Sequence, residues 1–102
     1  MYLVHTHLEL PGGSQLPPDV RALVRSAIIP GDGVEHVAVH PRSPSTLTLG
    51  FYLVAGALAE AEERAVMVCS RLLDELPQLA SARLTGAGVP LLPMTFVPQP
   101  VD

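Results

Sequence analysis

The first residues alternate between apolar and polar side chains, as expected for a strand with one buried face. In the segment YLVHTHLEL, residues 2–10, one side carries Tyr2, Val4, Thr6, Leu8 and Leu10. The other side carries Leu3, His5, His7 and Glu9. The stretch PGGS, residues 11–14, then breaks the pattern. We therefore expect a strand over residues 2–10 with two histidines on its polar side.

The spacing becomes helical after Pro17. A proline pair followed by Asp19 suits a first helical turn, where backbone N–H groups lack partners and a negative charge favours the helix dipole. Apolar residues then recur at the spacing of a single stripe, as Val20, Leu23, Val24, Ala27 and Ile28. The segment IPGDGV, residues 29–34, ends this helix.

Two further strands and a second helix follow. A strand over residues 34–40, a turn PRSP at 41–44 and a strand over 46–54 predict an antiparallel hairpin. The second of these strands points Leu47, Leu49, Phe51 and Leu53 to one side and Thr46, Thr48, Gly50 and Tyr52 to the other. Residues 57–76 then predict a helix that ends at Pro77, with the apolar stripe Leu58, Ala61, Ala65, Val68, Leu72 and Leu76.

A short fourth strand over residues 81–85 completes the order βαββαβ. This order is typical of the ferredoxin-like α+β fold, an antiparallel sheet with two helices on one face. We expect one such domain over residues 1–86, followed by an extended, proline-rich tail or arm over 87–102. A solvated tail is normally polar, whereas this one contains Leu91, Leu92, Met94, Phe96 and Val97. It is therefore expected to pack on something, either as a fifth strand or as an arm over a partner.

The histidines are the main candidates for acid–base catalysis or metal binding in this fold. The more apolar strand sides face the helices, so the opposite sides share one open face of the sheet. That face carries His5 and His7 on the first strand, Val34, His36, Ala38 and His40 on the second, and Tyr52 on the third. With the third strand between the other two, the histidine pairs stand about 9–10 Å apart. Gly50 between them leaves room for a ligand or a partner backbone.

Three functions of this histidine-rich sheet face stay open. In one interpretation this face is buried against a second subunit. In another it lines a pocket for an apolar small molecule, in which a histidine acts as acid or base near neutral pH. The catalytic candidates are then His5, His7, His36, His40 and Tyr52. In a third interpretation, His5 and His7 bind a metal, although zinc needs three or four ligands. No other cofactor is implied.

Composition narrows the class of protein. The chain has 102 residues, 48% of them hydrophobic, which favours burial against a partner subunit. Its six basic residues are dispersed arginines and its net charge is −4, so no nucleic-acid interface is expected. The single Cys69 excludes an internal disulfide and fits a reducing compartment; a buried structural role is expected for it. No signal peptide or membrane span is predicted, so we expect a cytoplasmic protein. The absence of lysine and asparagine suggests a GC-rich bacterial genome.

The element order, the chain length and the segment LDELPQLASARL, residues 73–84, resemble the dimeric α+β barrel proteins. That superfamily includes muconolactone isomerases and cofactor-free monooxygenases. The resemblance covers about residues 2–86 and implies a homodimer in which two open sheet faces pack together; no catalytic residue can be matched. We therefore expect a small homodimeric binding or accessory protein. The alternative is a cofactor-free isomerase, cyclase or monooxygenase of the dimeric barrel type, and whether the chain is an enzyme stays open.

Overall fold

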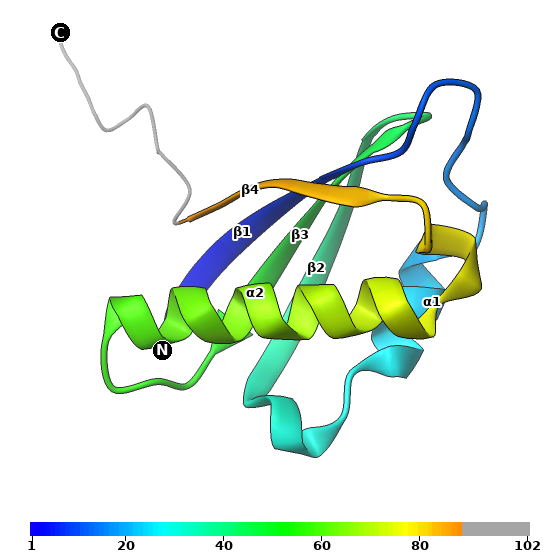
Figure 1. Cartoon of the computed structure of the whole chain (residues 1–102). Helices are drawn as coiled ribbons and strands as arrows, with labels where there is room; N and C mark the ends of the chain where they lie inside the picture. Colours follow the sequence, from blue (N-terminus) through cyan, green and yellow to red (C-terminus); the bar gives the residue numbers. More distant parts are fainter. Residues whose placement is uncertain (89–102) are drawn as a thin grey trace, which may run out of the picture.

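The computed structural model describes residues 1–88, which form one four-stranded antiparallel sheet with both helices on the same side (Figure 1). The strands are β1 (Tyr2–Glu9), β2 (Val34–Ser43), β3 (Thr46–Leu53) and β4 (Arg83–Gly88). The helices are α1 (Val20–Ala27) and α2 (Leu58–Glu75), with short 3-10 helices η1 (Pro30–Asp32) and η2 (Pro77–Leu79). The spatial order is β2-β3-β1-β4. The predicted ferredoxin-like fold is confirmed.

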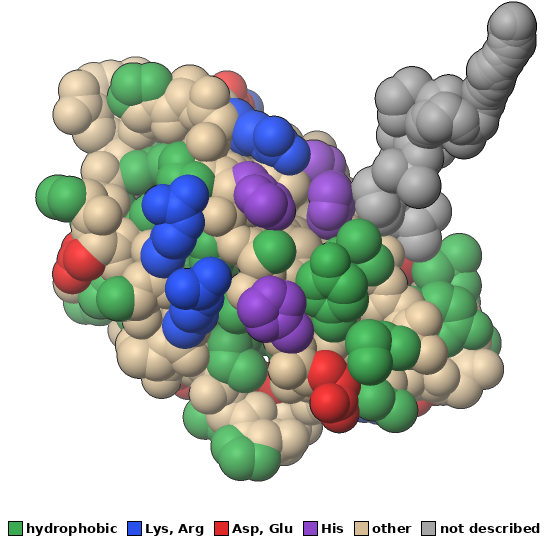
Figure 2. Space-filling model, turned by 180° about the vertical axis from the view of Figure 1, so that it is seen from behind, with side chains coloured by type: hydrophobic (Ala, Val, Ile, Leu, Met, Phe, Trp, Pro, Cys, Tyr) green, Lys and Arg blue, Asp and Glu red, His purple; other side chains and the backbone are tan. Residues whose placement is uncertain are grey.

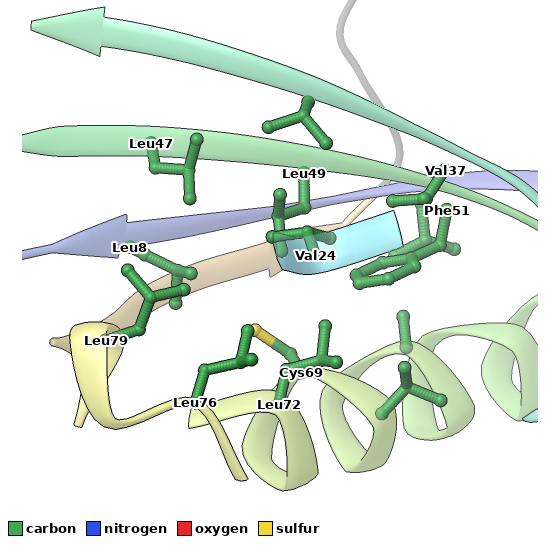
Figure 3. Packing of buried hydrophobic residues seen from close by; sticks show 14 of the residues in the cluster. Leu8, Val24, Val37, Leu47, Leu49, Phe51, Cys69, Leu72, Leu76 and Leu79 are labelled. Atoms are coloured by element: carbon green, nitrogen blue, oxygen red, sulfur yellow. The ribbon is translucent and has the colours of Figure 1, made fainter. Parts of the chain in front are cut away.

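The buried core lies between the sheet and the helices (Figure 3). Because side chains alternate along a strand, Leu8, Leu49 and Phe51 point into this layer, where each is at most 2% exposed. Leu72 of α2 and Val24 of α1 pack against them from the other side. The helical stripes predicted from spacing therefore face the core, although Leu58 at the start of α2 is 37% exposed.

Cys69 also lies in this core on α2, fully buried. Burial raises the pKa of its thiol. The Thr6 hydroxyl beside it acts in the opposite direction but more weakly. This contact does not meet hydrogen-bond geometry, so Thr6 Oγ1 is buried without a hydrogen-bond partner among residues 1–88. The buried structural role expected for Cys69 agrees with this position.

Asp32 links the loop between α1 and β2 to α2. The side chain of Asp32 is 8% exposed and forms an ion pair with Arg71, while it also accepts a hydrogen bond of 2.9 Å from the backbone N–H of Ile29. Arg71 further donates to the carbonyl oxygen of Ala27 at 3.1 Å and to Glu75 at 2.9 Å. One arginine therefore joins α2 to the end of α1 and to η1.

Several element bounds differ from the sequence expectation. Regular α1 begins at Val20 rather than Pro17, because the preceding residues form a turn in which the Val20 N–H bonds the Pro17 carbonyl. Strand β4 occupies Arg83–Gly88 instead of 81–85, so residues 87 and 88 belong to the sheet. The rest of the expected tail, residues 89–102, lies outside the described residues.

Strand β2 departs from simple alternation at both ends. Register shifts fall between Val34 and His36 and between Pro41 and Ser43. Val34 consequently pairs with Leu53 and packs against the core, so its expected position on the open face is wrong. At the other end the strand continues through Ser43, and the turn is confined to Pro44 and Ser45 instead of spanning 41–44. None of the helices in residues 1–88 is long and apolar enough to cross a bilayer.

Candidate functional site

The sheet face opposite the helices holds the candidate residues (Figure 2). Strand register arranges them in rows across β1, β3 and β2. One row is His7, Thr48 and His40; the next is His5, Gly50 and Ala38; the third is Leu3, Tyr52 and His36. Figure 2 shows histidine side chains beside an arginine and a group of hydrophobic side chains on this face. The structure therefore places the sequence-predicted residues in three adjacent rows.

The first row is organised around the Thr48 hydroxyl. Thr48 is 3% exposed, and its Oγ1 shares a hydrogen bond of 3.0 Å with His7 Nδ1, whose direction depends on the imidazole tautomer. Arg42 Nε donates to the same oxygen at 3.4 Å. A single buried hydroxyl thus holds an arginine from β2 and a histidine from β1 close together.

His5 lies over Gly50 in the second row. A Cβ atom on Gly50 would lie 3.3 Å from Cδ2 and 3.4 Å from Nε2 of the His5 ring, so glycine permits this position. The His5 pKa is lowered, first by burial and then by the positive charges of His7, His40 and Arg42. The His5 and His7 rings meet edge to face with centroids 6.2 Å apart. These residues, His5, His7, His40, Arg42 and Thr48, are called the Arg42 cluster below.

The third row forms the apolar end of the same face. The rings of His36 and Tyr52 are tilted against each other with centroids 5.4 Å apart. Leu3 is paired with Tyr52 across β1 and β3 and is half-buried. His36 therefore neighbours an aromatic ring, whereas His5, His7 and His40 belong to the Arg42 cluster.

Arg42 is the residue that the sequence reasoning missed. Its segment is predicted as a turn, but β2 is an edge strand, which tolerates Pro41 and continues to Ser43. The register shift between Pro41 and Ser43 leaves Arg42 without a paired residue, and its guanidinium reaches Thr48 on the open face. Alternation alone carries no signal for such a bulge.

The metal interpretation finds little geometric support in the described residues. No group of three or more histidine, cysteine, aspartate or glutamate side chains that could hold a metal ion occurs within residues 1–88. His5 and His7 remain a pair, and Glu9 instead lies 3.4 Å from Arg83. Zinc sites need three or four such ligands.

Surface hollows occur elsewhere on the molecule. One of about 390 Å³ lies beside Leu10, Pro11 and Arg83. A second, of about 640 Å³, lies between η1 and α2 and includes Ile29 and Met67. The histidines of the open face line neither of these two hollows. Within residues 1–88, the candidate residues therefore lie on the sheet face and outside both hollows.

Comparison of the chain with protein-family models and with curated protein sequences gives no match. The class of the protein accordingly follows from its architecture: an α+β protein of ferredoxin-like topology, with a sheet face that carries four histidines and that no helix of residues 1–88 covers.

Proposed function

We propose that this chain is a small homodimeric binding or accessory protein whose subunits associate through the open sheet face. The observation that carries the proposal is the one-sided arrangement of the fold (Figure 1). Both helices pack on the core side, and no helix in residues 1–88 covers the other side of the sheet. A second copy of the chain can supply the layer that covers such a face.

The apolar end of the face supports association. Leu3 and Tyr52 are half-buried there. Continuing the same alternation by two residues brings Met1 and Val54 to this end, and these are 74% and 52% exposed. Large exposed apolar side chains beside half-buried ones are typical of a protein interface.

The test is the mass of the full chain in solution, measured by light scattering or sedimentation at micromolar concentration. A dimer is expected. Val54→Glu places a charge in the contact and should shift the protein toward monomer. Met67→Glu is the matched control, because Met67 is 71% exposed on α2, away from the open face. A monomeric wild type, or equal effects of the two substitutions, contradicts the proposal.

A second function is favoured by the state of His5. Its lowered pKa keeps the imidazole neutral near pH 7, as a general base requires. In this alternative the protein is a cofactor-free enzyme that removes a proton from a small apolar substrate. Deuterium incorporation into acidic C–H positions of carbonyl compounds, followed by NMR, tests it. Exchange that is equal with wild type and His5→Gln eliminates His5 as that base.

A further inference from the structure

The Arg42 cluster combines one arginine with three histidines and has no carboxylate among its members. The ion pairs in residues 1–88 use Arg64, Arg71 and Arg83, and none involves Arg42. The hydrogen bond of Arg42 to Thr48 uses Nε, so the terminal guanidinium nitrogens keep their donors. One permanent cation and three groups that can be protonated therefore lie together on a chain whose net charge is −4 with its histidines neutral.

The titratable groups around this position are three histidines and one arginine, with one carboxylate on the same side of β1. From β1 come His5 and His7, and from β2 come His40 and Arg42; the charges of His7, His40 and Arg42 lower the pKa of His5. Glu9 also lies on this side of β1, but it is opposite Thr46 and pairs with Arg83 at 3.4 Å. Strand β3 contributes the uncharged Thr48, and β4 contributes Gly86 next to His7. The position is therefore complementary to an anion, and more so once a histidine is protonated.

The geometry also defines the shape of the ligand. Thr48 fixes Arg42 and His7 at one end, where a planar carboxylate can accept two hydrogen bonds from the guanidinium. The adjacent row contains Ala38, about 7 Å further along β2. Its neighbour Gly50 is already covered by His5 and Leu3, and Tyr52 follows in the third row. An apolar group attached to the carboxylate would lie over Ala38 and reach the Tyr52 ring.

We propose that the open sheet face binds a small monocarboxylic acid, with its carboxylate at Arg42 and its apolar body over Ala38 toward Tyr52. The inference rests on the proposed function, because the ligand occupies the face through which the subunits associate. Two such faces in contact bring the arginines of both copies out of water, which is costly for an unpaired charge. A bound carboxylate offsets that cost and so links ligand binding to association.

The experiment is a calorimetric titration of the full chain with benzoate, acetate and inorganic phosphate at pH 6 and pH 8. Benzoate is expected to bind more tightly than acetate or phosphate, and more tightly at pH 6. Arg42→Gln should weaken benzoate binding about tenfold or more. Arg21→Gln on the exposed side of α1 is the matched control and should leave it unchanged. His40→Gln, a second variant in the cluster, should reduce the pH dependence.

Equal binding of phosphate and benzoate overturns the inference, because the apolar body then contributes nothing. Unchanged benzoate binding by Arg42→Gln, with circular dichroism showing a native fold, overturns it as well. Light scattering on the same samples separates the two proposals. A dimer that does not bind benzoate refutes only the ligand, whereas a monomer that binds it through Arg42 refutes only the dimer and leaves the ligand site supported.

Discussion

Replacing Asp32 tests whether the link between the α1–β2 loop and α2 stabilises the fold. Asp32→Ala removes two interactions together: the ion pair with Arg71 and the hydrogen bond from the Ile29 N–H. Asp32→Asn keeps an acceptor for Ile29 but removes the charge. Glu75→Gln is the control, because it removes an exposed partner of the same arginine.

The expected loss of unfolding free energy follows from the exposure of the Asp32 and Arg71 side chains. Removing one member of a buried ion pair costs about 3–5 kcal/mol of unfolding free energy. Here the side chain of Arg71 is 26% exposed and retains Glu75 and the Ala27 carbonyl, so its charge stays partly solvated and paired. We therefore expect about 2–3 kcal/mol for Asp32→Ala, about 1–2 kcal/mol for Asp32→Asn, and at most about 0.5 kcal/mol for Glu75→Gln.

Urea unfolding followed by circular dichroism measures these differences. All variants are compared at one protein concentration, because association with a partner adds to the apparent stability. With a slope of about 1–3 kcal/mol per molar urea, Asp32→Ala should lower the midpoint by about 1–3 M. If Asp32→Ala and Glu75→Gln lower the midpoint equally, the buried pair does not stabilise the loop and the reasoning is refuted.

Three further predictions concern other parts of the structure. The His5 pKa lies below its ordinary value of 6.5, so the unfolded state binds more protons below that pH. The contribution of His5 to stability is therefore complete above pH 6.5 and is lost as the pH falls through the lowered pKa. His5→Gln should make the pH profile of the urea midpoint flatter on the acidic side. An unchanged profile contradicts this prediction. Cys69 should resist a thiol reagent in the native protein at pH 8 and react once urea unfolds it, because burial both shields the thiol and raises its pKa; fast native reaction would show that α2 opens readily. Gly33→Ala should cost about 1–2 kcal/mol, because Gly33 has φ +73° and the new Cβ would lie 2.5 Å from Arg64 Nη1; Gly31→Ala, which meets no atom within 4 Å and needs no positive φ, is its control in the same unfolding assay.

Periodicity was sufficient to predict the sheet, because β1 and β3 alternate without interruption and pair along their whole lengths. The register runs from Tyr2 with Leu53 to Glu9 with Thr46, so every side chain keeps the side that alternation assigns. The two helices carry apolar stripes that only the sheet can cover. The short β2–β3 connection requires those strands to be neighbours, and the ferredoxin-like pattern supplied the position of β3 between β1 and β2.

The ends of β2 could not be predicted in this way. A bulge depends on how two strands fit, and alternation within one strand carries no information about its partner. The register shifts near these two positions therefore place Val34 at the core and Arg42 on the open face. Strand β4 was displaced for a related reason. Its sequence RLTGAG has few β-branched or aromatic residues, and its pairing with β1 defines its bounds.

The position of β1 in the sheet has a consequence for how this chain is made. Of the four strands of this sheet, β1 is synthesised first, and it is an inner strand flanked by β3 and β4. Its pairing of Glu9 with Arg83 cannot form until more than seventy residues have followed. Until then the backbone of β1 has an unpaired edge, which chaperones or neighbouring nascent chains can engage. The sheet can be completed only after β4 has been synthesised and has left the ribosome, and its distant strand contacts favour slower folding than in a helical bundle.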